Sequence, residues 1–264
     1  MSVTAAQGFR AAGVAAGLRR DGGRDVALVI NDGPGDAVAA VFTGPDPANP
    51  ELWSERVVAD GRARAVVLNS GAANRGTGPE GFQLTHATAE LVAELAGISA
   101  FDVLVASTGP DRPIPDRERL LAGVRAAHTA LRTDGGDDAA QAAGNPGPAA
   151  QAVHRSASGW TIGGLAEGGA GLLVITTDAD VDPAGLDAAL RGATQPVGPS
   201  DVVTSDVGPR GAGRTVALLA SAAGVTPDPA EFAEALRQVV LALDGQSAAT
   251  ENTPAESKNS VPAS

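Results

Sequence analysis

Two glycine turns in the sequence carry side chains that could bind an oxygen atom. The segment Val67–Asn74 (VLNSGAAN) ends an apolar run in a Gly/Asn turn, and Val105–Gly109 (VASTG) ends another in a Thr-Gly pair. A Thr hydroxyl beside a Gly N–H at a strand end can form an oxyanion hole, because both donors point to one place without side-chain obstruction. A third glycine-rich segment starts at Trp160 and leads into the run Leu172–Thr177. Turn chemistry alone is the commoner explanation for segments of this composition.

Other candidate motifs are weaker. The segment Gly208–Thr215 (GPRGAGRT) nearly matches a phosphate-binding loop, but Arg214 replaces the lysine and the following VALLAS reads as a strand, where such a loop needs a helix. We interpret it as a Gly-rich turn between strands. The histidines His86, His128 and His154 lack metal-ligand spacing, and no G-x-S-x-G nucleophile elbow is present. The sequence therefore predicts no metal site and no cofactor.

The elements that must position these turns are predicted to be alternating strands and helices. Short apolar runs bounded by Gly, Pro, Asp or Asn are typical of strands. They are Asp25–Ile30, Ala37–Phe42, Ala63–Leu68, Asp102–Ser107, Trp160–Leu165, Gly171–Thr177 and Thr215–Ala220. Helices are expected at Gly81–Leu95, after the cap Asp182-Pro183, and at Phe232–Leu243 after the cap Asp228-Pro229. Strands outnumber crossover helices, so we expect an α/β protein with hairpins as well as βαβ units.

Two stretches are not predicted to form regular structure. Thr133–Ala150 is a mixture of Gly, Ala, Pro and Asp that we interpret as a loop or boundary. Asp244–Ser264 is polar and aperiodic, which is typical of a disordered tail. We therefore expect one domain over residues 1–243, followed by a disordered tail over 244–264.

Composition limits the class of protein. With 264 residues, 43% of them hydrophobic, the chain can bury a real core, and no apolar run is long enough to cross a bilayer. A net charge of −12 argues against nucleic acid as a partner, since phosphate binding needs Lys and Arg. The N-terminus lacks the pattern of a signal peptide, and there is no cysteine for a disulfide. We expect a protein of the cytoplasm with no membrane partner.

The succession of sequence blocks resembles the ornithine acetyltransferase family. The blocks are VTAAQGFRAAGVAAGLR, DVALVINDGPGDAVAAVFT, AVVLNSGAAN, GFQLTHATAE, VLVASTG, GWTIGGLAEG and LLVITTDAD, and together they cover most of Val3–Leu243. The resemblance implies a layered αββα fold of the ornithine acetyltransferase and DmpA-like superfamily. It also implies acetyl transfer from N-acetylornithine to glutamate in arginine biosynthesis. In that family the precursor cuts itself between Ala and Thr, and the new N-terminal Thr carries the acetyl group, with its own amine as base.

Carried over residue by residue, the resemblance assigns a small retained site. Thr108 and Gly109 match the family's oxyanion-hole pair. Asn69, Gly71 and Asn74 match the turn beside it. The family's fold and activity therefore predict a binding site for an acyl oxygen at the end of these two strands.

The remaining apparatus departs from the family. Glu167 occupies the position of the substrate-contacting Lys, and the Ala-Thr cleavage pair is absent, since Thr176 and Thr177 match a later element. The substrate-contacting threonines fall within Gly144–Pro148, and a further family loop has become Gly208–Thr215. From the resemblance we also expect the family's C-terminal region to be missing. The sequence thus resembles a shortened member that has lost its nucleophile.

Two functions of different classes remain open, beside a third possibility, a decaying gene product with no activity. The first is a non-catalytic paralogue that binds a small amino-acid ligand or a partner, which would be itself in an oligomer or a complete family member. The second is an acetyltransferase with an unrecognised nucleophile or with missing parts supplied by another chain. Glu167 argues against the family's substrate, because its carboxylate would face another carboxylate.

Overall fold

The computed structural model describes residues 2–44, 46–110, 114–144, 149–167, 171–195 and 214–251. Its helices are α1 Asn49–Val57, α2 Gly78–Ala96, α3 Arg117–Thr129, α4 Gly136–Ala143, α5 Pro183–Thr194 and α6 Pro229–Glu251, with 3₁₀ turns at Val58–Asp60 and Ala100–Asp102. Its strands are β1 Phe9–Val14, β2 Val26–Asn31, β3 Val38–Thr43, β4 Ala65–Asn69, β5 Val103–Ser107, β6 Ala150–Arg155, β7 Thr161–Ala166, β8 Leu172–Thr177 and β9 Arg214–Ala220.

The strands form two mixed sheets. The first has four strands in the order β1-β2-β4-β5, and the second has five in the order β3-β9-β8-β7-β6. In each sheet one pair is parallel, β4 with β5 and β8 with β9. The other neighbours are antiparallel. Hairpins and crossover connections therefore both occur, as the sequence predicts.

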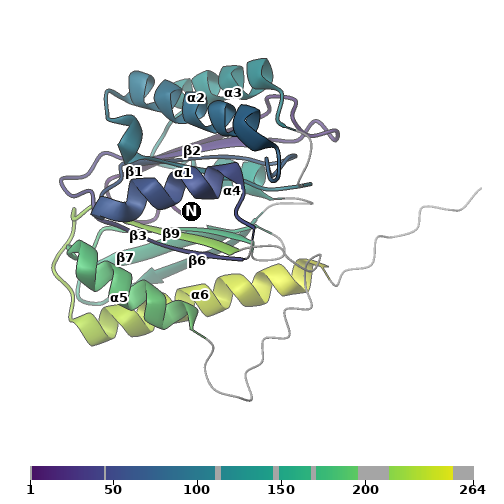
Figure 1. Cartoon of the computed structure of the whole chain (residues 1–264). Coiled ribbons are helices and arrows are strands. Elements are labelled where there is room, and N and C mark those ends of the chain that lie inside the picture. Colours follow the sequence, from purple (N-terminus) through teal and green to yellow (C-terminus); the bar gives the residue numbers. More distant parts are fainter. Residues whose placement is uncertain are drawn as a thin grey trace, which may run out of the picture.

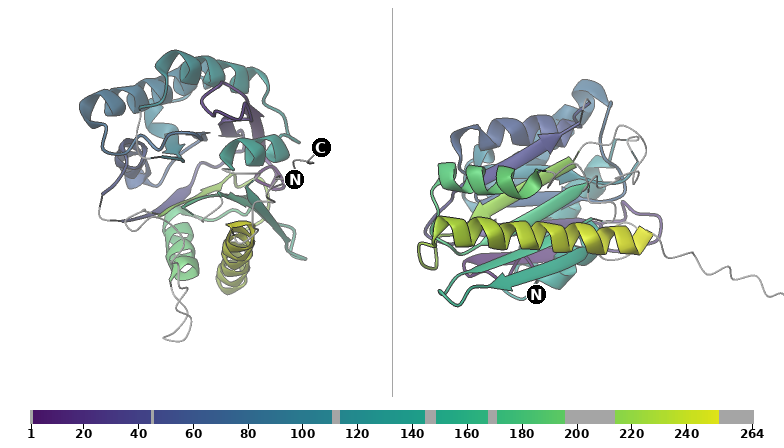
Figure 2. Two further views of the ribbon diagram at one scale, coloured as in Figure 1. Left: turned by 90° about the vertical axis from the view of Figure 1, so that its right-hand side faces the viewer. Right: turned by 90° about the horizontal axis from the view of Figure 1, so that it is seen from below.

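The two sheets pack face to face between two layers of helices. Helices α2 and α3 lie on the outer face of the four-stranded sheet, and α5 and α6 lie side by side on the outer face of the five-stranded sheet (Figures 1 and 2). Strand β8 shows why the sheet is buried on both sides. Leu172 and Val174 belong to the core between the sheets, whereas Leu173 and Ile175 pack against the outer helices. The expected αββα arrangement is confirmed.

The strands predicted from the seven apolar runs are all present, with ends that differ by one or two residues. The helix caps are confirmed as well. Asp182 accepts a hydrogen bond from Gly185 N at the start of α5, and Asp228 accepts bonds from Ala230 N and Glu231 N at the start of α6. The sequence analysis did not find β1, β6, α1 or α3.

The interpretation of Thr133–Ala150 as a loop was wrong over residues Gly136–Ala143, which form α4. This helix packs on the inner face of β1 and β2. A Cβ at Gly13 of β1 would lie 1.9 Å from Asp138 O, so the helix backbone rests directly on the strand. The buried side of α4 consists of glycine and alanines. Without a large apolar side chain, the segment gave no helical periodicity to detect.

The expected start of the tail at Asp244 was also wrong. Helix α6 continues to Glu251, and Arg214 at the start of β9 donates two hydrogen bonds from Nη2 to the Asp244 carboxylate, at 2.8 and 3.0 Å. The residues of α6 that follow Leu243 include no large apolar side chain, so hydrophobic periodicity could not predict the last turns of the helix. The rest of the expected tail, residues 252–264, lies outside the described residues.

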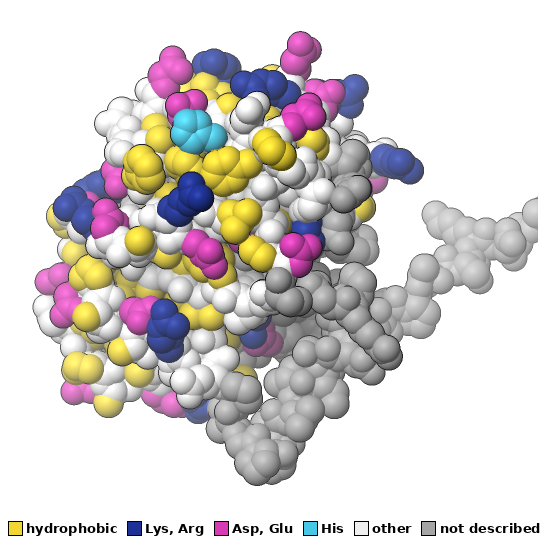
Figure 3. All heavy atoms as spheres, in the orientation of Figure 1, with side chains coloured by type: hydrophobic (Ala, Val, Ile, Leu, Met, Phe, Trp, Pro, Cys, Tyr) yellow, Lys and Arg dark blue, Asp and Glu magenta, His cyan; other side chains and the backbone are white. Residues whose placement is uncertain are grey.

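The surface over α1 and α2 is partly apolar (Figure 3). Leu52 and Phe101 are exposed there, and Phe101 stacks on the buried ring of Trp53 with centroids 5.6 Å apart. The guanidinium of Arg56 lies 5.4 Å from the centre of the Phe82 ring. Within the described ranges, no helix combines the length and the apolar character needed to cross a membrane.

Candidate functional site

Strand β5 leads directly into Thr108 and Gly109, the pair expected to form an oxyanion hole. Thr108 N donates to Asn69 O over 2.9 Å, which continues the ladder of β4 and β5 by one residue. The Thr108 residue is 4% exposed, and among the described residues its Oγ1 has no hydrogen-bond partner. Because buried hydroxyls usually have a partner, this one is a candidate donor to a ligand.

Gly109 brings the turn after β5 against the turn after β4. Its φ is +119°, a backbone conformation that other residues rarely adopt. A Cβ at this position would lie 2.9 Å from Ala72 N and 2.9 Å from Gly71 C. Ala73 N also donates to Pro110 O over 2.8 Å. The Thr-Gly pair and the turn at Gly71 therefore form one compact unit.

The asparagines of this turn hold its shape. Asn69 Nδ2 donates to Ala72 O over 3.1 Å, and Ser107 Oγ donates to Asn69 Oδ1 over 2.7 Å. Asn74 has a φ of 55° and donates from Nδ2 to Gly81 O, 2.9 Å away, and to Thr85 Oγ1. The expected turn is thus present, and these two amides are engaged inside the protein.

Asp25 supports the same turn from the other side and was not found from the sequence. Its side chain is buried and accepts hydrogen bonds from the N–H groups of Ala16, Leu18 and Arg19 at 2.6, 2.6 and 3.0 Å. The carbonyl of Leu18 lies against Gly71. The carboxylate therefore holds the loop that packs on the turn. Because its partners are main-chain N–H groups, the sequence gives no sign of this role.

A polar cluster from three distant segments lies next to this turn. Glu51 Oε1 accepts a hydrogen bond from Thr215 Oγ1 over 3.0 Å, and Glu51 Oε2 lies 3.5 Å from Arg75 Nη2. The same Oε2 accepts a bond from Ala48 N over 2.6 Å. Arg75 directly follows Asn74 in the chain. The cluster therefore ties the beginning of β9 to the turn after β4.

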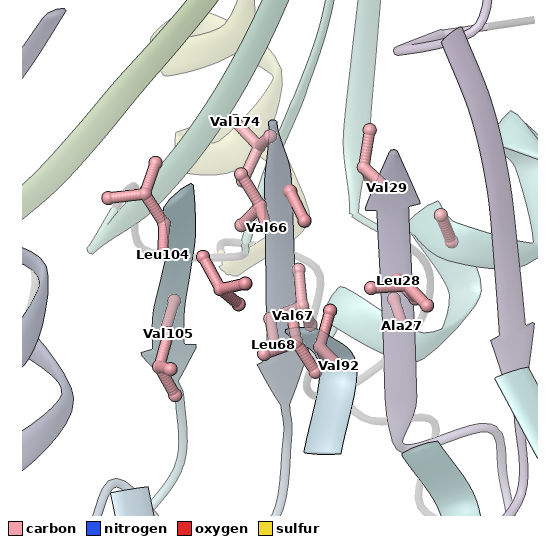
Figure 4. Close-up of a cluster of buried hydrophobic side chains, with 14 of the residues drawn as sticks. Ala27, Leu28, Val29, Val66, Val67, Leu68, Val92, Leu104, Val105 and Val174 are labelled. Atoms are coloured by element: carbon pink, nitrogen blue, oxygen red, sulfur yellow. The ribbon is translucent and has the colours of Figure 1, made fainter. Parts of the chain in front are cut away.

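The beginning of β8 lies at this end of the molecule as well. Leu172 pairs with Thr215 in the register of β8 and β9. Val174 of β8 lies in the core between the sheets with Val66 of β4 (Figure 4). Thr215 is also bonded to Glu51, which contacts Arg75 just after the turn that follows β4, so the beginning of β8 lies at the same end as that turn. The β7–β8 connection lies at the end of the sheets that carries the Thr-Gly pair.

Glu167 follows β7 in this connection. Its N–H donates to Leu172 O over 2.9 Å, which closes the hairpin, and residues 168–170 lie outside the described part of the chain. Thr176 and Thr177 lie at the opposite end of β8. Both are fully buried, and their hydroxyls donate to main-chain carbonyl oxygens 2.7 and 2.9 Å away. The structure therefore does not bring either threonine to the Thr-Gly pair.

Two further predicted segments are only partly described. Of Gly144–Pro148, only Gly144 is described, and its carbonyl accepts a hydrogen bond from Arg19. Of Gly208–Thr215, only Arg214 and Thr215 are described, and they begin strand β9. The absence of a following helix agrees with the interpretation that this is not a phosphate-binding loop.

Two open hollows lie at the other end of the sheets. The larger, of about 520 Å³, is lined by residues that include Arg10, Arg64, Leu95 and His128. The Arg10 guanidinium is already paired with Asp32, which raises its pKa through a side-chain hydrogen bond. The smaller hollow measures about 410 Å³. Neither is lined by the Thr-Gly pair, whose unpartnered hydroxyl is the stronger indication of a site.

Comparison with known proteins identifies the family. The model of the ArgJ family matches residues 10–250. The chain belongs to the ArgJ family. Its relatives include the arginine biosynthesis bifunctional protein ArgJ of Streptomyces avermitilis, 49% identical over 254 residues, and that of Streptomyces coelicolor, 47% identical over 254 residues. Each alignment covers 90% of this chain and 64% of the relative, so the chain spans less than two thirds of these ArgJ proteins.

Solved structures agree with the ArgJ assignment. The ornithine acetyltransferase from Mycobacterium tuberculosis, solved in complex with ornithine, is 44% identical with a TM-score of 0.61. The match covers 63% of this chain and 91% of that chain. A β-aminopeptidase from a Burkholderia species is only 14% identical, yet it has a TM-score of 0.57 over 92% of this chain and 84% of its own. The latter shares the fold alone.

Proposed function

We propose that the chain binds a small N-acylated amino acid at the Thr108–Gly109 end of the sheets and does not transfer the acyl group. The observation that carries the proposal is the buried Thr108 Oγ1, which has no hydrogen-bond partner among the described residues. Membership of the ArgJ family supports an amino-acid derivative as the ligand, as does the ornithine bound by the Mycobacterium tuberculosis enzyme.

The absence of a nucleophile supports binding without transfer. Covalent acyl transfer needs an activated hydroxyl, thiol or amine, and the sequence from Leu165 to Ile175 contains no Ser, Thr, Cys or Lys. The hydroxyls of Thr176 and Thr177 are engaged at the other end of β8. Thr108 itself has no described base bonded to its hydroxyl. A site of this kind retains oxygen binding and lacks the group that would accept the acyl chain.

Glu167 supports a preference among ligands. The sequence resemblance assigns it to the position of the family's lysine, and it brings a carboxylate to the β7–β8 connection. A carboxylate on the ligand side chain would be repelled there, whereas an amine would be attracted. We therefore expect N-acetylornithine to bind more tightly than N-acetylglutamate.

Isothermal titration calorimetry with the purified full chain tests this function. N-acetylornithine should bind, and Thr108→Val should lower its affinity by about 3- to 10-fold. This corresponds to the loss of one hydrogen bond from a hydroxyl to a neutral oxygen. Valine has the shape of threonine, so the variant should keep the wild-type melting temperature. Absence of binding to wild type, or equal binding to both proteins, would exclude the proposed site.

A second candidate function is acetyl transfer with a nucleophile supplied by another chain. The observation that favours it is the retained Thr-Gly pair, together with longer relatives that are named arginine biosynthesis bifunctional proteins. In that case the partner is a complete family member, and we place the assembly in the cytoplasm. Acetyl transfer that appears only when this chain is combined with a complete ArgJ protein that keeps its nucleophile but lacks its own oxyanion-hole threonine would support this alternative.

A further inference from the structure

Ser70 lies beside Thr108 on the same face of the four-stranded sheet. Ser70 N donates to Asp25 O over 2.9 Å, which continues the pairing of β2 and β4 by one residue. Thr108 N donates to Asn69 O and continues the pairing of β4 and β5 in the same way. Since successive side chains of a strand alternate between faces, Ser70 and Thr108 share one face, and the bonded pair Asn69 and Ser107 occupies the other.

This shared face points into the space between the two sheets. Val66 and Leu104 precede Ser70 and Thr108 by four residues in their strands, so they lie on the same face. Both lie in the core with Val174 of the opposite sheet (Figure 4). The two hydroxyl groups therefore face the interior at the end where β8 begins.

Both hydroxyls are buried, and neither has a partner among the described residues. Ser70 is 0% exposed and Thr108 is 4% exposed. Several other buried hydroxyls of this protein are bonded, as in Ser54, whose Oγ donates to Val105 O over 2.8 Å, although Thr4 Oγ1 also has no partner among the described residues. Two adjacent unbonded hydroxyls are costly in a folded protein, which points to an oxygen that is bound between them.

The spacing of the two residues suits one shared oxygen. Neighbouring strands lie about 4.8 Å apart, and an oxygen about 2.8 Å from each of two hydroxyls at that separation can accept from both. Nearby main-chain groups are also donors. No hydrogen bond from the N–H of Gly71, Ala72 or Gly109 reaches another described residue. An acceptor such as a carbonyl oxygen therefore fits better than an amine.

We propose that Ser70 is a second ligand-binding hydroxyl, which donates with Thr108 to a single acyl oxygen of the bound amino acid. The inference rests on the proposed function and extends it, because it makes the acyl group itself the feature that is recognised. Ser70 then distinguishes N-acetylornithine from ornithine, which carries no acyl oxygen.

The test compares Ser70→Ala with Ser221→Ala by calorimetry and thermal melting. Ser70→Ala should weaken the binding of N-acetylornithine by about 3- to 10-fold and leave the melting temperature of the free protein unchanged or higher, since it removes an unbonded hydroxyl. Ser221→Ala is the matched control, because Ser221 is buried at the other end of the sheets and its Oγ donates to Gln7 O over 2.6 Å. It should lower the melting temperature, because this bond is lost, and leave the affinity unchanged.

Each other outcome counts against one of the proposals. If Thr108→Val weakens binding and Ser70→Ala does not, the role of Ser70 is wrong and the proposed function stands. If Ser70→Ala lowers the melting temperature of the free protein without changing affinity, its hydroxyl is bonded inside the protein and the inference fails. If wild type binds no acylated amino acid, both proposals fail.

Discussion

Gly109 shows how one residue without a side chain allows the candidate site to form. Its positive φ turns the chain after β5 toward the turn after β4, and its missing Cβ lets Ala72 N and Gly71 approach. Thr108 is then held between this contact and its ladder bond to Asn69. The position of the Thr108 hydroxyl is therefore a consequence of the backbone around Gly109.

Gly109→Ala should lower the free energy of unfolding by about 2 to 4 kcal/mol, because it adds both a strained φ and a steric clash. Gly97→Ala is the control. Gly97 also has a positive φ, of 68°, but a Cβ there would meet nothing within 4 Å, so we expect a loss of only about 1 kcal/mol. Urea unfolding of the two variants measures the difference. Equal losses would show that the approach to Ala72 is not tight.

The residues of this site differ in how far the sequence could predict them. Thr108 and Gly109 end an apolar run, so their position at a strand end follows from local pattern. Asp25 acts by accepting hydrogen bonds from main-chain N–H groups. Glu51 acts by accepting a hydrogen bond from Thr215, which is remote in the sequence. Ser70 stood inside a predicted turn, but only the register of β2, β4 and β5 places its hydroxyl beside Thr108.

At the scale of elements, α4 depends on small side chains. Its alanines at 139, 140, 142 and 143 are completely buried, and its backbone rests on Gly13. Local pattern found long amphipathic helices such as α2, whereas α4 has no large apolar residue to mark a face. These small side chains let the helix backbone lie directly against β1 and β2.

Ala140→Leu should therefore destabilise the protein by about 2 kcal/mol through overpacking. The neighbouring residue Gln141 is exposed, so Gln141→Leu should change stability by no more than about 0.5 kcal/mol. Chemical denaturation of both variants checks the prediction. A tolerated Ala140→Leu would mean that α4 is not packed between the sheets.

Helix α6 is joined to β9 by Arg214 and Asp244. Burial raises the pKa of the Asp244 carboxyl above its ordinary value, and this effect outweighs the attraction of Arg214, which lowers it. A raised pKa in the folded state means that the folded protein holds this proton more tightly than the unfolded chain. Its contribution to stability is therefore fully present below the ordinary pKa and is lost as the pH rises through the folded value.

Asp244→Asn removes this titration and should gain stability relative to wild type as the pH rises above the ordinary pKa of an aspartate, about 4. Urea unfolding of both proteins at several pH values provides the comparison. Asp187→Asn on α5, where the acid forms an exposed pair with Arg191, serves as a surface control. If wild type instead becomes more stable relative to Asp244→Asn as the pH rises, the pKa of Asp244 is not raised in the folded protein.

At the scale of the whole molecule, the two sheets are formed by one uncut chain, in which β8 follows β7 directly. The hairpin from β7 to β8 is closed by the bond from Glu167 N to Leu172 O, and the sequence between these residues contains no Ala-Thr pair. We therefore expect a single chain after prolonged incubation at 37 °C. Intact-mass spectrometry should show one species, and two fragments that sum to the full mass would indicate self-cleavage.

The central claim, that the site binds an acyl group without transferring it, is tested most directly by acetyl exchange. The protein is incubated with N-acetylornithine and isotopically labelled glutamate, and labelled N-acetylglutamate is measured against a Thr108→Ala control. Wild type should form no more product than the control, under conditions in which calorimetry shows N-acetylornithine bound. Labelled N-acetylglutamate above the control would show that the chain has a working nucleophile and would contradict the account.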